Sequence, residues 1–424
     1  MDGTAKDSHG GVAMPSYAEV FRIRGYRAIF LAAALSTWGD YLARVTIAAI
    51  VYTRTGSALA AAATFAVSLL PTIFGRSLLA PIADRIPYKY VLIASYLVRA
   101  ALVGALISAV LAHGALWLLF SLLFLIELVG GPASASTQIL MTDLFSDRRL
   151  YARAIGLGNI SDQVNQAIGL TLGGLVIAWV GPIRGLWFDL ATFLISALVI
   201  TLVVKVQVVP GTPTSGLAGF FRDIGEGARY LFRHPVLLSL LALSLCSVWA
   251  IAAPEAVAIA YAYERLGSAR LGGLLMAAPI LGAVAGLFIV GRWQPERQNS
   301  RMIVLALLMP LPLIGTVFAP PVPIAWVLWF GSGVLQAFML PLQSTFSLVV
   351  PLQMRARVFG LAGALSVAAT GVAFLVAGYL AELLRSPASA VAICAVASLL
   401  AIVILAVRWP RAALRAAVDT AYNS

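Results

Sequence analysis

Charged side chains are scarce in this chain. They make up 11% of its 424 residues, whereas a soluble globular protein carries about 25%. Hydrophobic residues make up 61%, which excludes an ordinary soluble domain and predicts a protein embedded in a membrane. Only seven charged residues fall inside the apolar stretches, and the remainder lie at their ends, in links or in tails. The seven are Asp40, Arg44, Arg99, Glu127, Asp162, Asp189 and Glu255.

Cysteine and histidine are also rare, and their positions exclude several kinds of site. The two cysteines, Cys246 and Cys394, both lie inside apolar stretches, which argues against a disulfide framework. The three histidines are scattered in a tail and in links without a partner at metal-ligand spacing, so we expect no metal site. No Ser-His-Asp set, Gly-rich phosphate loop or HExxH pair occurs. We therefore expect neither an enzyme nor an ATP-driven pump, and no cofactor.

The chain is rich in apolar stretches that are long enough to cross a bilayer. A spanning segment must satisfy its own backbone hydrogen bonds, so each stretch of roughly 20 apolar residues predicts one helix. The fold class is therefore an all-α integral membrane protein with twelve transmembrane helices. Residues 1–25 are polar and do not resemble a cleavable signal. The predicted spans are 28–53, 57–80, 90–112, 115–139, 152–180, 184–206, 236–261, 270–292, 301–318, 323–349, 356–384 and 388–408.

The basic residues are distributed unequally between the two sides of the membrane. The side that holds both tails and the even-numbered links carries 22 lysines and arginines, and the opposite side carries five. By the positive-inside rule, both termini are predicted to be cytoplasmic, in a cell membrane. The net charge of +12 is explained by this topology, so no nucleic-acid partner is expected.

The longest link, 207–235, divides the chain into two halves of six spans each. We expect a cytoplasmic tail at 1–25, a first half at 26–206, a second half at 236–408 and a cytoplasmic tail at 409–424. The later part of the link alternates apolar and charged residues at intervals of three and four, as in an amphipathic helix lying on the membrane face. A tether between the halves is favoured over a regulatory element. The apolar residues are Leu217, Phe220, Phe221, Ile224, Leu231 and Phe232.

The link after the second span resembles the cytoplasmic Gly-x-Leu-Ala-Asp-Arg-x-Gly-Arg-Lys signature of the major facilitator superfamily. Its Asp, its Arg and its final Lys match, whereas Ala80 and Pro87 replace the two glycines and Tyr88 replaces a basic residue. The segment is Ala80-Pro81-Ile82-Ala83-Asp84-Arg85-Ile86-Pro87-Tyr88-Lys89.

Further segments are similar to the drug:proton antiporter group of that superfamily, which includes macrolide-efflux and siderophore-export proteins. The likeness covers about residues 20 to 408. The segments are Gly39-Asp40 followed by Arg44, Pro132-Ala133-Ser134, Gly173-Gly174, Arg233-His234-Pro235, and Val350-Pro351 through Arg355-Ala356-Arg357-Val358-Phe359-Gly360.

The resemblance implies two six-helix halves around a central cavity that opens alternately to either side, with the substrate site near the bilayer midplane. Spans 1, 4, 7 and 10 are then expected to line the cavity, and spans 2, 5, 8 and 11 to form the moving contacts between halves. It also implies a cytoplasmic gate in which the signature Asp packs against the start of span 11. The gating candidates are Asp84, Arg85, Lys89, Arg355 and Arg357.

The buried charges on cavity-lining spans are the candidates for proton coupling or substrate binding. An ionisable group at membrane depth costs at least about 2.5–3.5 kcal/mol, so its presence there suggests a function. Asp40 and Arg44 lie on one helical face and serve either as a static ion pair or in coupling. Glu127 has no charged neighbour within a turn in sequence, and it either binds a proton or a cationic substrate or is a neutral Glu hydrogen-bonded to a backbone carbonyl. Glu255 follows Pro254, where the helix is loosened.

Two other buried charges are expected to support rather than carry the function. Asp189 is predicted to lie about a turn inside the outer face, where hydration is cheap, in a structural role. Arg99 lies on a supporting span and is predicted to pair with one of the acidic groups, without an indication of which one.

The fifth span carries a polar stripe that continues into small residues. Asn159, Asp162, Gln163 and Gln166 fall on one face, and the glycines that follow allow close helix packing, which we expect at a seam between halves. The packing candidates are Gly169, Gly173 and Gly174. The candidate cavity lining is apolar and aromatic with scattered amides, which suits amphiphilic compounds. It comprises Trp38, Gln163, Gln166, Trp249, Gln336 and Gln343.

The sequence therefore predicts a secondary active transporter that exports a small hydrophobic or amphiphilic compound, a drug or secondary metabolite, in exchange for protons. The alternatives are export of an endogenous metabolite such as a siderophore, an importer or uniporter of the same fold, and a membrane sensor that transports nothing. The expected partners are the substrate, protons and the lipid bilayer. The protein is expected to be a monomer.

Overall fold

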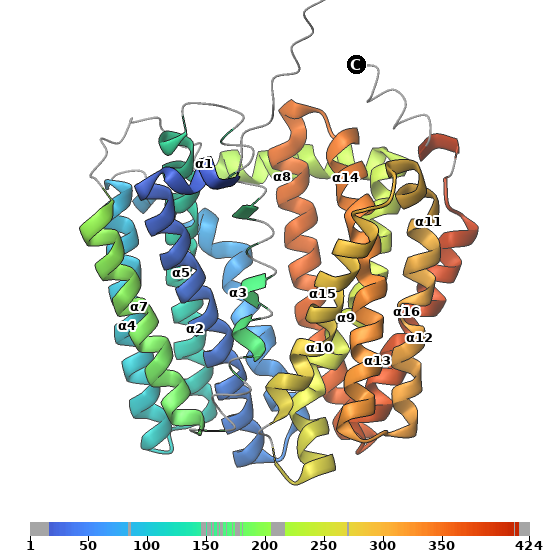
Figure 1. The fold of residues 1–424 in the computed structure, drawn as a ribbon, viewed down its shortest axis with the longest axis horizontal. Helices are drawn as coiled ribbons and strands as arrows, with labels where there is room; N and C mark the ends of the chain where they lie inside the picture. Colours follow the sequence, from blue (N-terminus) through green and yellow to red (C-terminus); the bar gives the residue numbers. More distant parts are fainter. Residues whose placement is uncertain are drawn as a thin grey trace, which may run out of the picture.

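The structure, a computed structural model, describes residues 17–83, 86–145, 150, 154, 157–158, 161, 164–166, 168–171, 173, 179, 181–204, 217–268, 271–410 and 412–414. The regular secondary structure in these residues is helical. Figure 1 shows the long helices side by side in one bundle, with α1 and α8 lying across one end of it.

The first half of the bundle contains five long helices that follow predicted spans. The short α1, Tyr17–Arg22, precedes them, and described helical residues between 150 and 179 occupy the place of the predicted fifth span. The long helices are α2 (Arg24–Thr55), α3 (Ala58–Ala83), α4 (Tyr88–Leu111), α5 (Leu116–Leu144) and α7 (Pro182–Val203).

The link between the halves contains α8, and the second half follows it directly. Two predicted spans are divided into pieces, because Pro310 and Pro341 each lack the N–H that would donate to the carbonyl one turn earlier. The elements are α8 (Leu217–Arg233), α9 (Pro235–Leu266), α10 (Gly272–Val290), α11 (Pro295–Leu308), α12 (Leu311–Ile314), η2 (Gly315–Phe318), α13 (Val322–Leu335), η3 (Gln336–Phe338), α14 (Met339–Val349), η4 (Leu352–Met354), α15 (Arg355–Leu383) and α16 (Pro387–Val407).

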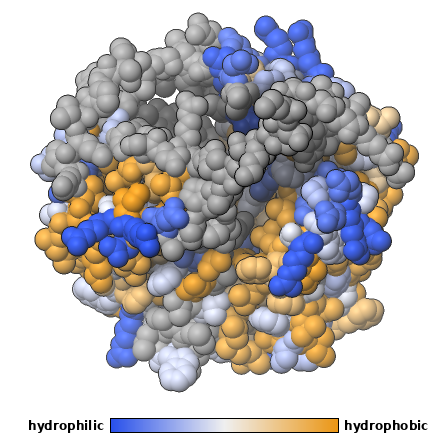
Figure 2. Space-filling model, turned by 45° about the horizontal axis from the view of Figure 1, so that its top comes forward, coloured by the Kyte–Doolittle hydropathy of each residue, from blue (hydrophilic) through white to orange (hydrophobic). Residues whose placement is uncertain are grey.

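The outer surface of the bundle is apolar, as lipid contact requires. Within the described residues, nine helical segments are long and apolar enough to cross a membrane. Large side chains such as Phe318 and Val407 are exposed. Figure 2 shows apolar residues over much of the flank and hydrophilic residues clustered toward the end that carries α8. The predicted all-helical membrane fold class is confirmed, whereas the predicted count of twelve spans is not fully confirmed. The fifth predicted span, 152–180, lies largely outside the described residues.

Each half has its own hydrophobic core, and one of the two cores extends across both halves. In the first half, Leu106, Leu119 and Phe193 are fully buried in one cluster. The second-half cluster contains Tyr261 and Trp329, and it also takes in residues of α2 and α3 from the first half. The two halves are therefore joined by continuous apolar packing.

The seam between α10 and α13 is built on glycine. The backbones approach so closely that a Cβ on Gly333 would lie 2.7 Å from the carbonyl carbon of Pro279, and one on Gly282 would lie 2.9 Å from that of Phe330. No side chain fits at these distances without moving a helix backbone.

We expect Gly333→Ala to destabilise the protein by about 1–3 kcal/mol, the usual cost of overpacking a core. Thermal unfolding of the purified protein in detergent measures this loss. Gly331→Ala is the matched control on the same helix, since a Cβ there meets nothing within 4 Å. Equal unfolding temperatures for the two variants would contradict the close packing of α10 against α13.

Candidate functional site

A polar face of α2 forms the centre of the candidate site. Ser36, Asp40 and Arg44 are spaced by four residues and therefore lie on one side of the helix. Asp40 pairs with Arg99 of α4, whose Nη2 donates to Oδ1 at 2.6 Å. The same guanidinium donates from Nη1 to the Ser36 hydroxyl at 3.2 Å and from Nε to the backbone carbonyl of Ile126 at 3.0 Å. The prediction that Arg99 is the partner of an acidic group is confirmed, and that group is Asp40.

A second ion pair lies beside the first. Arg44 donates to a single oxygen of Glu127, from Nη2 at 2.6 Å and from Nε at 2.8 Å. The side chains are 13% and 8% exposed, so the pair is largely withdrawn from solvent. The view of Glu127 as a carboxyl without a charged neighbour is therefore wrong. Its partner comes from another helix, and sequence spacing along α5 gives no sign of it.

The surroundings of Arg99 explain how a guanidinium is accommodated at this depth. Its Cζ lies 4.3 Å from the centroid of the Phe193 ring, a cation–π contact from α7. On the α5 side the guanidinium lies over Gly130, where a Cβ would make an ordinary contact with the same carbon at 3.5 Å. Arg99 is 5% exposed. Its hydrogen bonds, its counter-ion and an aromatic face together compensate for the lost hydration.

Asp189 on α7 belongs to the same cluster, which corrects its predicted place near the outer face. It is 1% exposed, and its Oδ1 has no hydrogen-bond partner among the described atoms. The neighbouring Thr192 hydroxyl donates to the backbone carbonyl of Asp189 instead, at 2.7 Å. The close approach depends on Gly39, where any Cβ would overlap Oδ1 of Asp189 and Oγ1 of Thr192.

Glu255 brings a fourth carboxyl to the site from the other half of the bundle. It lies on α9 immediately after Pro254, and it is partly buried. Arg44 is the basic group whose charge acts on Glu255. Tyr41 of α2 lies beside Arg44, with its ring centroid 5.0 Å from Cζ of that residue. In the described part of the chain the site thus combines four carboxyls with two guanidinium groups.

Other predicted residues of the fifth span pack against α2. The indole of Trp38 donates to Oδ1 of Asn165 at 2.9 Å. Cβ atoms on Gly169 and Gly173 would lie 3.2 Å from the Cα atoms of Trp38 and Leu42. These glycines therefore form a seam inside the first half, and the prediction of a seam between halves is wrong for them. Gln166 is partly buried, whereas Gln163, Asp162, Asn159 and Gly174 lie outside the described residues.

The cavity-lining candidates of the second half are not joined to the charge cluster by any described hydrogen bond. Trp249 on α9 and Gln336 in η3 are partly buried, and Gln343 on α14 is exposed. Their assignment to the substrate pathway stays a prediction.

Three of the gating candidates, Lys89, Arg355 and Arg357, are described by the structure. Lys89 donates to the carbonyl of Thr201 at 2.8 Å, within the first half. Arg355 donates to the carbonyls of Val350 and Ser347, at 3.2 and 3.0 Å. Arg357 forms an ion pair with Glu226 of α8. Asp84 and Arg85 lie outside the described residues, so the predicted contact between Asp84 and the start of span 11 stays a prediction.

The opposite end of the bundle is held closed by contacts between the halves. Glu382, near the end of α15, accepts a hydrogen bond from the Ser57 hydroxyl and one from the Leu59 backbone N–H at 3.4 Å. It therefore caps the start of α3. Farther in, the rings of Phe65 and Phe374 lie 5.7 Å apart. Gly378 makes this approach possible, since a Cβ there would lie 2.9 Å from Cα of Leu59.

A helical bundle with an apolar flank and charges buried between its helices defines an integral membrane protein, in which such charges mark ion or substrate pathways. The family profile of the Major Facilitator Superfamily matches residues 29–347. The chain therefore belongs to the Major Facilitator Superfamily and is a multi-pass membrane transporter.

The chain is also similar to known transporters, which is consistent with this assignment. The chain is 29% identical over 239 residues to the multidrug efflux pump Tap of Mycolicibacterium fortuitum, covering 55% of this chain and 56% of that pump. It is 27% identical over 376 residues to Tap of Mycobacterium tuberculosis, covering 84% and 86% of the two chains. The fold is similar to that of the nucleoside transporter NupG, with a TM-score of 0.70 at 12% identity over 92% of this chain and 99% of that one.

Sequence reasoning missed three contributors to the site, namely Ser36, Phe193 and the carbonyl of Ile126. Only Ser36 carries a signal, because it continues the four-residue spacing of Asp40 and Arg44 by one turn. Phe193 and Ile126 lie in ordinary apolar runs, and their contacts with Arg99 depend on how the helices pack.

Proposed function

We propose that this transporter exports a small hydrophobic or amphiphilic compound in exchange for protons, by alternating access. The observation that carries the proposal is the excess of carboxyls in the buried cluster. Asp40 and Glu127 each have an arginine, whereas Asp189 and Glu255 have no ion pair among the described residues. Buried carboxyls without a counter-ion are accommodated at lowest cost as neutral acids, so the cluster is suited to hold protons.

The arrangement also suggests how a proton alters contacts between the halves. Arg44 is bound to Glu127 of its own half and acts on Glu255 of the other half. A proton added to Glu127 removes the charge that holds Arg44, and the guanidinium is then free to pair with Glu255 once that carboxyl has released its own proton. Protonation in the first half is thereby converted into attraction between the halves, which is the kind of differential contact that a conformational switch requires.

Two observations support the proposed direction of transport and the proposed class of compound. The relatives named above are described as multidrug efflux pumps. Aromatic side chains, Trp38 and Tyr41 on α2 and Trp249 on α9, accompany the charges and suit an amphiphilic substrate better than a sugar or a phosphate.

The positive-inside bias places both termini, and with them α8, in the cytoplasm. The end closed by Glu382 is then the outer one. In this proposal the structure represents a state closed to the outside, and export requires that the contact of α15 with α3 open.

We expect Glu382→Ala to shift the transporter toward a state open at that end, because α3 loses its cap and its polar link to α15. Spin labels at the exposed positions Thr55 and Leu266, in a chain lacking Cys246 and Cys394, report the separation of the halves. The longer-distance population should grow in Glu382→Ala. It should not change in Glu264→Ala, an exposed carboxyl on α9 whose partner is the adjacent Arg265. Identical distance distributions in all three proteins would contradict a gate at Glu382.

The proposed export is tested in cells and then in vesicles. The sensitivity to a panel of toxic compounds is compared between cells that produce the protein and cells that lack it. Compounds that inhibit only the cells lacking the protein are its substrates. Everted membrane vesicles with an acidic interior should then accumulate these compounds. Loss of accumulation when the proton gradient is collapsed supports exchange for protons, and accumulation that is independent of it contradicts proton coupling.

A further inference from the structure

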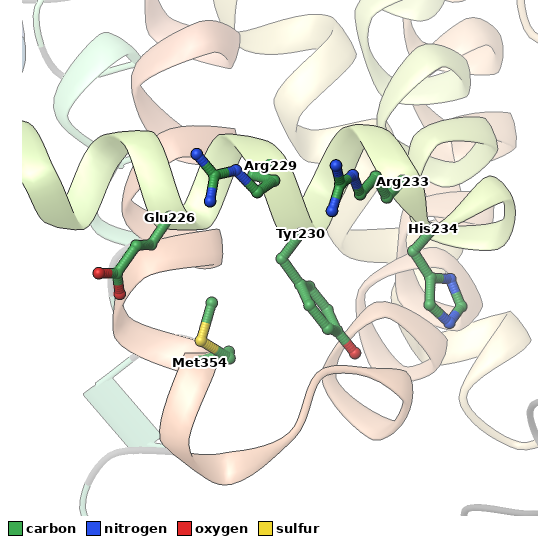
Figure 3. A pocket seen from close by; sticks show the side chains of 6 residues that line it. All are labelled: Glu226, Arg229, Tyr230, Arg233, His234 and Met354. Atoms are coloured by element: carbon green, nitrogen blue, oxygen red, sulfur yellow. The ribbon is translucent and has the colours of Figure 1, made fainter.

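A pocket of about 360 Å³ lies between α8 and η4, at the end of the bundle that carries α8. Its lining from α8 follows the spacing of one helix face, at positions 226, 229, 230 and 233. His234, which follows α8 directly, continues this face, and Met354 closes the pocket from η4. Figure 3 shows Tyr230 of α8 and His234, just after the end of α8, pointing in the same direction, toward the side on which Met354 lies. The volume falls within the roughly 300–1,000 Å³ typical of small-ligand sites.

The pocket carries an excess of positive charge. Its one carboxylate, Glu226, is bound to Arg357 of α15. Arg229 and Arg233, one turn apart, have no hydrogen bond or ion pair to any other described residue, and Figure 3 shows their guanidinium groups extending in the same direction along α8. Two guanidinium groups at this spacing form a site for an oxyanion, above all a phosphate.

An unpaired donor or acceptor also faces this region. Nδ1 of His234 is buried and has no hydrogen-bond partner in the described structure. The imidazole stacks on the Tyr230 ring, at 6.0 Å between centroids, which fixes its orientation. A buried polar atom without a partner costs free energy unless a ligand or water satisfies it.

The position of α8 favours a lipid as the source of the phosphate. The helix lies across the end of the bundle, beside an apolar flank (Figures 1 and 2). Phe232, between the two arginines in sequence, is 58% exposed and offers its ring to acyl chains. Basic residues at the cytoplasmic end of spanning helices attract anionic headgroups.

We propose that this pocket binds the phosphate headgroup of an anionic phospholipid from the adjacent leaflet. The bound lipid stabilises the docking of α8 on α15, where the backbones are so close that a Cβ on Gly227 would lie 3.0 Å from the carbonyl oxygen of Arg357. The proposal concerns binding alone and does not depend on the direction or coupling of transport.

Native mass spectrometry of the full-length protein, titrated with phosphatidylglycerol or phosphatidylcholine, tests the site. We expect the wild type to prefer phosphatidylglycerol. Arg229→Gln and Arg233→Gln should each weaken that binding about fivefold, which is the usual contribution of one basic residue to binding at an anionic surface. The double variant should weaken it about 30-fold, because the two contributions add in free energy. The control is Arg292→Gln/Arg301→Gln, which removes the same charge at the same end of the bundle and should stay within about twofold of the wild type.

Three results would overturn the proposal. The first is a wild type without preference for phosphatidylglycerol, which is informative even if the double variant fails to fold. The second is displacement of phosphatidylglycerol by millimolar inorganic phosphate, which would identify the site as one for a soluble anion. Equal binding by the double variant and the control would likewise exclude this pocket as the lipid site.

Discussion

Arg99→Gln is expected to destabilise the transporter by about 3–5 kcal/mol, the usual cost of removing one partner from a buried ion pair. The substitution leaves the Asp40 carboxylate without its counter-ion, and it removes the donors to Ser36 and to the Ile126 carbonyl. Thermal unfolding in detergent measures the loss. Arg184→Gln, at an exposed position on α7, is the control and should unfold at the temperature of the wild type.

The double variant Asp40→Asn/Arg99→Gln separates the structural role of this pair from its functional role. Once both charges are removed, no isolated carboxylate remains, so at least half of the lost stability should return. Proton-driven transport by the double variant should be absent, because an amide at position 40 cannot take up and release a proton. A double variant that recovers proton-driven transport along with stability would show that the Asp40–Arg99 pair is structural only.

Glu127→Gln is expected to abolish proton-driven accumulation in everted vesicles while leaving the protein folded. Glutamine keeps the shape of the side chain and an oxygen that can accept the Arg44 hydrogen bonds, and the Asp40 and Glu255 carboxyls still act on the Arg44 charge. The unfolding temperature should therefore fall less than in Arg99→Gln. The loss of activity follows because the amide cannot carry a proton between the two faces of the membrane. Asp40→Asn is expected to have the same effect.

Glu264→Gln, at an exposed carboxyl of α9, is the matched control and should retain full accumulation. If Glu127→Gln and Asp40→Asn both accumulate substrate at the wild-type rate under a proton gradient, coupling does not reside at these residues.

The architecture was predictable because lipid imposes a length and a composition on each spanning helix. The breaks in the ninth and tenth spans were not predicted, although Pro310 and Pro341 carry the signal for them. A hydropathy pattern averages over many residues, whereas a missing N–H acts at a single turn.

The candidate site was predicted in its members but not in its pairing. Asp40 and Arg44 share a helical face, which suggested an ion pair between neighbours on α2. The structure instead joins each of them to a residue of another helix, Arg99 and Glu127. The packing of neighbouring helices determines which carboxyl a long arginine side chain reaches, and residue spacing along one helix carries no information about that packing.

Asp189 was misplaced for a related reason. Its position near the start of α7 suggested hydration, but Gly39 lets α7 approach α2 closely enough to bury the carboxyl. The sequence shows Gly39 itself, but it does not show which helix packs against that glycine. The same holds for Gly169 and Gly173, whose packing surface is α2 of their own half.

The most direct test of proton coupling follows protons rather than substrate. The purified transporter is placed in liposomes that enclose a pH-sensitive dye, and a gradient of a substrate found in the sensitivity screen is imposed without a pH difference. We predict that substrate leaving the liposomes drives protons inward in the wild type and not in Asp40→Asn or Glu127→Gln. Substrate movement by the wild type without any change of internal pH would contradict proton exchange at the buried carboxyl cluster.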